Sequence, residues 1–119
     1  MLEIEINNEK FELTTNIGTI KRIESQFNHE AFVSLINRFQ DMKTQELITL
    51  LGCGLKDKDE RKKMSELIEE NWGFGDLVDV LDIFIQKLQY PGKTEKEIAE
   101  KNEGKLAQFK EMKEAGLIQ

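Results

Sequence analysis

The 119-residue sequence has few of the side chains that catalyse reactions or hold metals: one histidine, one cysteine, one tryptophan and one tyrosine. The single cysteine, Cys53, excludes an intramolecular disulfide and favours a reducing compartment. No spacing typical of a zinc site or of a phosphate-binding glycine loop is present. We therefore expect a protein that is not an enzyme, with no cofactor, no metal site and no small-molecule substrate.

Positive charge and long apolar runs are also scarce. The chain has 17 basic and 23 acidic residues, for a net charge of −6, whereas nucleic acid binding depends on neutralising phosphates. The longest largely apolar stretch, Leu77 to Leu88, is too short to span a bilayer. The start of the chain lacks the basic and apolar segments of a signal peptide. These features predict a cytoplasmic protein that binds neither nucleic acid nor a membrane.

The pattern of apolar residues predicts a mainly α fold. Residues 2–13 alternate between apolar and polar side chains on both sides of Asn7–Glu9, which predicts a short N-terminal β-hairpin. Helical spacing then predicts a helical domain of about five to six helices. The first four buried faces contain Ile17, Ile20, Ile23 and Phe27; Phe32, Leu35, Ile36 and Phe39; Leu47, Ile48, Leu50 and Leu51; and Met64, Leu67 and Ile68. The most apolar helix, residues 77–88, is predicted to be the central one.

Polar residues and glycines predict where these helices begin and end. Asn16 and the threonines before it offer N-cap oxygens for the first helix, and Asn28 for the second. Gly52 and Gly54 predict a C-cap and a turn after the third helix. A loop is predicted over residues 56–59. Asp76 is the predicted cap of the central helix, which ends before Pro91.

A change in composition divides the chain into residues 1–92, the hairpin and helical core, and residues 93–119, a charged C-terminal helix or tail. The second part holds six lysines and six glutamates, so the first carries the whole charge of −6. Thr94–Glu97 matches a capping box. The helix behind it has a thin stripe of Ile98, Asn102, Leu106, Phe109 and either Met112 or Lys113. This stripe either docks on the core of its own chain or binds a neighbouring molecule, and we favour the intermolecular role.

The aromatic turn Trp72–Gly75 is a second candidate for protein binding. Its two rings either project from a binding loop or fold back against the end of the core, and we favour the second arrangement. The candidate protein-binding residues are therefore Trp72, Phe74, Ile98, Leu106, Phe109 and Met112.

The remaining reactive side chains have simpler structural interpretations. His29 is expected to be a surface residue in the first turn of a helix, and Cys53 a small buried hydrophobic residue. Asp57 and Asp59 lack the glycine and glutamate positions of a calcium loop. Asp76, Asp79 and Asp82 are expected to form a solvated face.

Three N-terminal segments carry a resemblance to a known family. Leu2–Asn7, Lys10–Leu13 and Ile17–Glu24 together resemble the opening of the small tail assembly chaperones of long-tailed, siphovirus-type bacteriophages and prophages of Gram-positive hosts. The resemblance implies a mainly helical, non-enzymatic protein of the bacterial host cytoplasm. It implies binding to the tape measure protein and support for assembly of the tail tube protein around it. Such families often have a second, longer form made by frameshifting. Self-association into a homo-oligomer is expected to suit a long client.

A different class of function is also compatible with the sequence. The chain has the size and charge of a small acidic regulatory adaptor, or anti-repressor, that docks a specific host protein through its acidic face. Binding through charge weakens as ionic strength rises, whereas binding through apolar surface persists. Salt dependence therefore separates the two hypotheses. A small enzyme has the least support, because no acid, base and nucleophile are grouped.

Overall fold

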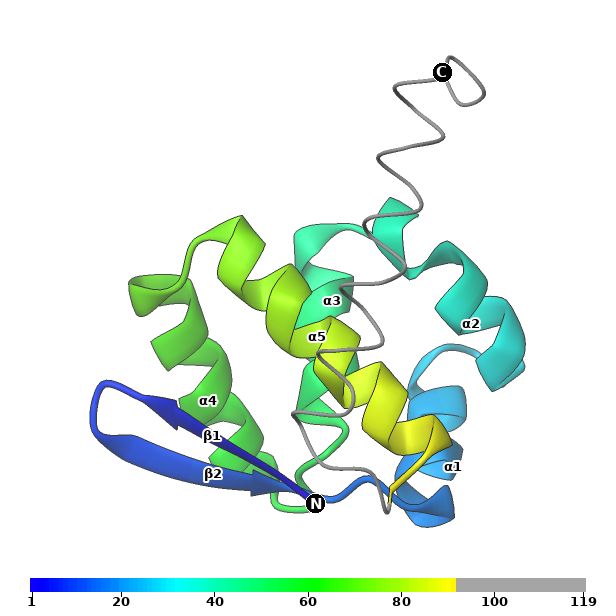
Figure 1. Ribbon diagram of the computed structural model, residues 1–119, viewed down its shortest axis with the longest axis horizontal. Helices are drawn as coiled ribbons and strands as arrows, with labels where there is room; N and C mark the ends of the chain where they lie inside the picture. The colour runs from blue at the N-terminus through cyan, green and yellow to red at the C-terminus, as the bar shows by residue number, and fades with distance from the viewer. Residues whose placement is uncertain (92–119) are drawn as a thin grey trace.

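The computed structural model describes residues 1–91, in which a two-stranded antiparallel hairpin precedes five α-helices and a short 3-10 helix (Figure 1). The strands are β1 (Leu2–Ile6) and β2 (Glu9–Leu13). The helices are α1 (Ile17–Gln26), α2 (Phe32–Arg38), the 3-10 helix η1 (Phe39–Asp41), α3 (Thr44–Gly52), α4 (Lys58–Asn71) and α5 (Phe74–Gln89). The predicted mainly α class with an N-terminal hairpin is confirmed. Within residues 1–91, no helix combines the length and apolarity needed to cross a membrane.

The hairpin has the pairing that its alternating sequence predicts. Ile4 lies opposite Phe11, and both side chains are buried. Asn7 and Asn8 form the turn with φ values of 50° and 67°, a left-handed backbone that asparagine tolerates in two-residue hairpin turns. The apolar face of the hairpin rests on the helices, with β1 beside α4 (Figure 1). This support is needed because an isolated hairpin is barely stable in water.

Helix α1 begins where predicted, and its predicted buried face is confirmed at Ile23, with Ile20 and Phe27 partly buried against the core. Asn16 is its N-cap, and the Asn16 side-chain oxygen accepts the Thr19 N–H at 3.1 Å. The prediction that Ile17 belongs to the buried face is wrong: Ile17 is 70% exposed, while Thr19 and Ile23 are buried. Thr19 and Ile23 are four residues apart and share one helix face. The Thr19 hydroxyl is accommodated there because it bonds to Asn16 and Arg22.

The prediction that Asn28 caps the second helix is wrong. Asn28 and His29 lie in the turn after α1 with φ values of 56° and 62°. The N-cap of α2 is Ala31, which makes no side-chain cap bond. Instead, the Glu24 carboxylate accepts the Phe32 N–H at 2.9 Å. Since Glu24 belongs to the preceding helix, this cap depends on helix packing. His29 is therefore an exposed turn residue rather than part of a helix.

The glycine cap predicted after α3 is replaced by Cys53, whose backbone is right-handed at φ −63°. Gly54 has a different function, because a Cβ at this position would lie 2.6 Å from Leu13 Cδ2 and 2.8 Å from Leu13 Cβ. The Thr14 N–H donates to the Gly54 carbonyl at 2.8 Å. The absence of a side chain on Gly54 thus lets the turn after α3 approach the end of β2.

Arg22 completes this junction from α1. Its Nε donates to the Cys53 carbonyl at 3.0 Å, and its Nη2 donates to Thr14 Oγ1 at 2.8 Å. One side chain therefore joins α1, the end of the hairpin and the end of α3. We refer to Leu13, Thr14, Arg22, Cys53 and Gly54 as the Gly54 seam.

Helix α4 begins inside the segment predicted to be a loop. It starts at Lys58, and Asp57 is its N-cap, with Asp57 Oδ1 accepting the Asp59 N–H at 2.8 Å. An ion pair of 2.6 Å between Lys63 and Glu9 joins α4 to the first residue of β2. The paired aspartates are therefore explained by helix capping.

Helix α5 is central, as predicted, and packs against α1 and α3 (Figure 1). Its buried apolar residues are Leu77, Leu81, Phe84, Ile85 and Leu88. The prediction that Asp76 is the N-cap is wrong, because α5 begins at Phe74 and Gly73 is the N-cap. Asp76 lies in the first turn, where its carboxylate accepts the Gly73 N–H at 2.8 Å. Asp76 therefore acts as a capping residue inside the first turn and not at the N-cap position. The prediction was misplaced because α5 begins at Phe74, three residues before Leu77, the first residue of its continuous apolar pattern.

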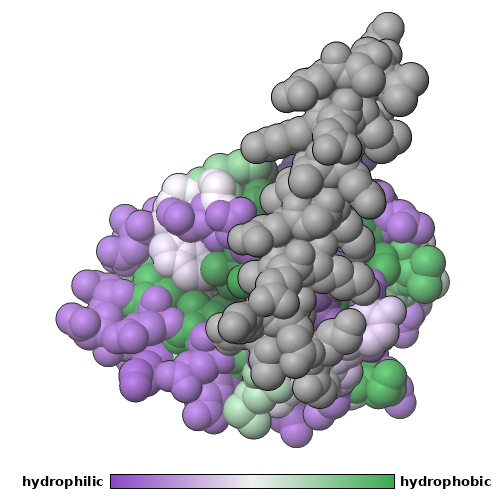
Figure 2. Space-filling model, in the orientation of Figure 1, coloured by the Kyte–Doolittle hydropathy of each residue, from purple (hydrophilic) through white to green (hydrophobic). Residues whose placement is uncertain are grey.

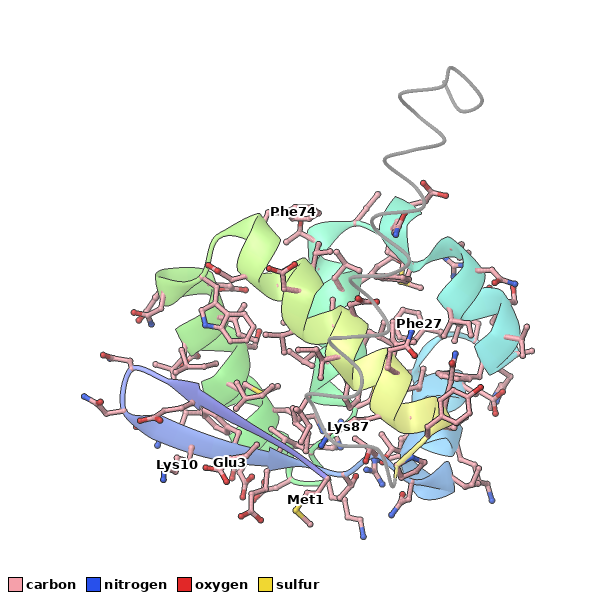
Figure 3. The ribbon with its side chains drawn as sticks, in the orientation of Figure 1. Met1, Glu3, Lys10, Phe27, Phe74 and Lys87 are labelled. Carbon is pink, nitrogen blue, oxygen red and sulfur yellow. The ribbon has the colours of Figure 1, made fainter. Side chains whose placement is uncertain are left out.

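A buried lysine joins the last turn of α5 to the start of the hairpin. Lys87 is only 9% exposed, and its Nζ donates to the Met1 carbonyl at 3.0 Å. The Met1 amino group donates to Thr15 Oγ1 at 2.9 Å. Figure 3 labels Met1 and Lys87 at this junction. Lys87 is therefore buried with a hydrogen-bond partner for its charged end, as buried lysines require.

Candidate protein-binding site

An apolar groove opens where η1, α3 and the start of α5 meet. It is lined by Phe39, Gln40, Leu47, Phe74 and Val78, and its volume is about 230 Å³. We refer to these five residues as the Phe74 groove. Sites for small molecules usually measure roughly 300–1,000 Å³, so this groove is sized for one or two apolar side chains. Its lining contains no charged group, so the groove can bind apolar surface but offers no acid or base.

Phe74 forms the exposed side of the groove. Its side chain is 60% exposed, while Leu47 at the same groove is buried. Figure 3 labels Phe74 at the beginning of α5, on the end of the helix away from Lys87. A phenylalanine left in water at the mouth of an apolar groove gains free energy when another apolar surface covers it. This arrangement is typical of a protein-binding site.

The aromatic turn divides its two rings between the core and the surface. Trp72 is the C-cap of α4, where its N–H donates to the Ile68 carbonyl at 3.0 Å, and its ring packs against the hydrophobic core. The expectation that both rings fold back against the core is therefore correct for Trp72 and wrong for Phe74. The difference arises because Gly73 starts a new helix between them and redirects the chain.

The other four predicted protein-binding residues are Ile98, Leu106, Phe109 and Met112. They lie outside the described residues, so the structure gives no position for them. Conversely, no sequence signal indicated that Leu47 and Val78 contribute to a site, because their spacing places them only in apolar helices. The available signal was the aromatic pair Phe39 and Phe74, but these residues are far apart in the chain and no local pattern connects them.

A charged cluster extends along α2, from Glu30 just before the helix to Arg38 at its last residue. Arg38 forms an ion pair of 2.6 Å with Glu30, whose carboxylate also accepts the Ser34 hydroxyl at 2.7 Å. The hydrogen bond from Arg38, followed by the one from Ser34, lowers the pKa of Glu30 to about 2. This cluster joins the start of α2 to its end. The cluster therefore stabilises α2, the helix that directly precedes Phe39 of the groove.

Cys53 is placed as a structural residue. It is buried, and its Sγ donates to the Thr49 carbonyl at 3.3 Å. Desolvation raises the pKa of the thiol to about 11, which opposes formation of the reactive thiolate. In the part of the chain that the structure describes, no group of three or more His, Cys, Asp or Glu residues is placed to hold a metal ion.

On the face shown in Figure 2, polar residues dominate and apolar atoms appear between them. Fold and site together define a small acidic helical protein with a partly open apolar groove. No protein family model, curated protein or solved structure matches this chain. Its function is therefore inferred from the residues described above and from the resemblance of the N-terminal segments.

Proposed function

We propose that this chain is a non-catalytic tail assembly chaperone of a long-tailed phage or prophage. In this proposal it binds apolar helical surface of the tape measure protein in the host cytoplasm and supports assembly of the tail tube protein. The observation that carries the proposal is the Phe74 groove, an apolar site of about 230 Å³ with a 60% exposed phenylalanine at its mouth. The resemblance of the N-terminal segments directs this general binding capacity toward phage tails.

The shape of the groove suits a helical client. Helix-in-groove recognition uses large apolar side chains spaced three or four residues apart on one helix face. A groove bounded by two helices and η1 holds one or two such side chains between Phe39 and Phe74. A long helical client with repeated apolar residues offers many equivalent attachment points. Several copies of the chaperone, or a homo-oligomer, would then cover the client along its length.

The charge of the chain supports a solubilising role. Residues 1–92 hold 11 basic and 17 acidic residues. A surface with excess charge of one sign keeps molecules apart and opposes aggregation. Chaperone copies bound along an aggregation-prone helix would therefore give the complex an acidic coat.

The test is copurification with a long helical tape measure protein produced from a neighbouring gene. The decisive variant is Phe74→Ser, and its matched control is Val33→Ser, because Val33 is 65% exposed on α2 and does not line the groove. Loss of one large buried apolar side chain costs about 1.5–3 kcal/mol, or roughly 10- to 100-fold in affinity. We expect this loss for Phe74→Ser alone. Equal binding by both variants would refute the assignment of the groove.

Salt separates this function from that of an acidic adaptor. Binding through the Phe74 groove should persist when ionic strength is raised to about 1 M, where charge interactions are screened beyond about 3 Å. If client binding disappears under these conditions and Phe74→Ser has no effect, the adaptor is the better description.

A further inference from the structure

A polar pocket opens between the end of α1, the length of α3 and the N-terminal half of α4. Its volume is about 210 Å³, and it shares no lining residue with the Phe74 groove. Two of its lining residues are basic and none is acidic, although the whole chain carries a net charge of −6. We refer to it as the Arg61 pocket. Its polar lining residues are Gln26, Gln45, Thr49, Arg61, Lys62 and Ser65.

The guanidinium of Arg61 is held in place by neutral acceptors. Its Nε donates to the Leu55 carbonyl at 2.7 Å, and its Nη2 donates to the Lys56 carbonyl at 2.9 Å. The stem of Arg61 lies against Gly52, where an added Cβ would be 3.8 Å from Arg61 Cγ. A guanidinium has five N–H donors, so these two bonds leave others available. The two carbonyl oxygens orient the group but leave its positive charge uncompensated.

No carboxylate of residues 1–91 forms an ion pair with Arg61 or Lys62. Asp57 caps α4 by accepting the Asp59 N–H and does not line the pocket. The positive charge reaches the pocket wall at Cys53: burial raises the pKa of this thiol, and the charge of Arg61, followed by that of Arg22, opposes the rise. The interior of the pocket is therefore suited to an anion.

The charge of the pocket favours a dianion over a monoanion. A phosphate group carries about −1.5 to −2 at pH 7, which matches the two cations, whereas a carboxylate carries a single negative charge. The planar fork of an arginine also fits the oxygens of a phosphate group, and a lysine adds a point charge. Ser65 supplies a hydroxyl on the same helix as both cations.

We propose that the Arg61 pocket binds a phosphate group through the Arg61 guanidinium and the Lys62 ammonium, with the Ser65 hydroxyl as a further donor. The phosphate group is either free or part of a phosphomonoester. This inference does not rest on the proposed chaperone function, because the two sites have no residue in common.

A second cavity indicates where the rest of a phosphomonoester would lie. This cavity, of about 300 Å³, shares Gln26, Gln45 and Thr49 with the Arg61 pocket, so the two are contiguous. Its lining also contains Glu30, Arg38 and Glu46. Because Arg38 forms an ion pair with Glu30, the charge of Glu46 remains as a negative excess. The group attached to the phosphate should therefore be neutral or cationic.

The test is an NMR titration of the full ¹⁵N-labelled chain with inorganic phosphate at pH 7.5, with ionic strength held constant by sodium chloride. We expect saturable shifts at the Arg61 Nε–H and at backbone amides around the pocket, with a dissociation constant of about 1–10 mM, as few contacts allow. Acetate should bind several-fold more weakly because it carries one charge. Shifts that do not saturate, or equal affinity for acetate and phosphate, would overturn the proposal.

Phosphoethanolamine distinguishes the two sources of the phosphate group. Its ammonium would extend toward Glu46 in the second cavity. Tighter binding than that of inorganic phosphate would assign the pocket to a phosphomonoester, whereas equal affinity would assign it to free phosphate.

Lys62→Gln is the decisive variant, because Lys62 is exposed and its loss leaves the Arg61 bonds to Leu55 and Lys56 intact. Loss of one charge-assisted hydrogen bond should weaken phosphate binding about tenfold. Lys58→Gln is the matched control: it makes the same change of charge one turn earlier in α4, at an exposed residue that does not line the pocket. We expect less than a twofold effect there. Equal losses in both variants would mean that phosphate senses only the general charge of α4 and would refute the site.

Phe74→Ser separates this inference from the proposed function. It should leave phosphate binding unchanged, because Phe74 does not line the Arg61 pocket. If phosphate binds and no client does, the anion site stands and the chaperone function fails. If a client binds through Phe74 and phosphate does not bind, the chaperone function stands and the anion site is refuted.

Discussion

The Gly54 seam and the Phe74 groove differ in how completely neighbouring elements close around an apolar side chain. At the seam, Leu13 is fully buried and touches the backbone at Gly54 so closely that a Cβ would clash at 2.6 Å. At the groove, Leu47 is buried but Phe74 remains 60% exposed. The seam is also held by Arg22, whereas the lining of the groove has no charged group.

This contrast separates residues that maintain the fold from those available for binding. In a closed junction, adding or removing side-chain atoms changes the free energy of unfolding, because close-packed interiors relax little. At an open groove, a substitution of the exposed residue leaves the free energy of unfolding nearly unchanged. Its effect is on the affinity for a binding partner. Substitutions in the Gly54 seam should therefore change stability, whereas substitutions in the Phe74 groove should change binding affinity.

The largest expected effect is that of Gly54→Ala. The new Cβ would overlap Leu13, and overpacking of this kind lowers the free energy of unfolding by about 1–3 kcal/mol; we expect the upper end because two Leu13 atoms lie within 2.8 Å. Gly75→Ala is the matched control, since no atom lies within 4 Å of its added Cβ. In α5 this control should be neutral or stabilising, by up to about 1 kcal/mol. Urea denaturation measures both, and equal stabilities would remove the distinction between closed and open regions.

Arg22→Met should have the next largest effect. It keeps much of the side-chain length but removes the bonds to Cys53 and Thr14, and we expect a loss of about 1–2 kcal/mol. Because Cys53 is buried in the seam, opening of the seam is measured by its labelling rate with a thiol reagent, which should rise. Arg22→Lys retains the charge without the planar fork and should give an intermediate rate. Unchanged labelling in Arg22→Met would mean that packing alone closes the seam.

Phe74→Ser should leave stability nearly unchanged. Exposed positions without special contacts usually alter the free energy of unfolding by less than about 0.5 kcal/mol, and Phe74 is 60% exposed. The comparison is Phe84→Ala on the same helix, where the buried ring predicts a loss of about 3–5 kcal/mol. Thermal denaturation followed by circular dichroism distinguishes them. A loss for Phe74→Ser as large as that for Phe84→Ala would place Phe74 in the core.

The smallest effect is expected from Glu30, which lies just before α2. Its pKa is lowered from 4.5 to about 2 by the bond from Arg38, so the folded state favours the carboxylate. The resulting stabilisation is present above about pH 4.5 and is lost as pH falls toward 2. Glu30→Gln should flatten this part of the stability profile, and the effect should shrink in salt because the pair is partly exposed. NMR titration of the Glu30 carboxyl tests the pKa directly, and a midpoint near 4.5 would contradict the ion pair.

Local sequence signals predicted the elements better than the contacts between them. The Asn7–Asn8 turn and the Asn16 cap formed as expected, because the responsible atoms are close in sequence to the groups they satisfy. Asn28 failed as a cap because Glu24, from the previous helix, accepts the N–H at the start of α2. Ile17 failed as a core residue because the neighbours of α1 cover the face centred on Ile23.

The candidate site was predicted only in part for the same reason. An aromatic beside two glycines was enough to single out Phe74, but its exposure depends on where α5 begins relative to η1 and α3. Phe39 and Leu47 complete the groove from elements that are separate in sequence. The C-terminal residues Ile98, Leu106, Phe109 and Met112 remain predictions from their spacing.

The amino-acid sequence by itself determined the hairpin, the succession of helices and the central position of α5. These follow from apolar periodicity and turn chemistry, which act between residues only a few positions apart. Tertiary structure alone decided that Gly54 must lack a side chain, that Lys87 holds the Met1 carbonyl, and that Phe74 stands exposed beside a groove. Each of these depends on the separation of atoms from distant parts of the chain, and that separation is defined only when the helices pack.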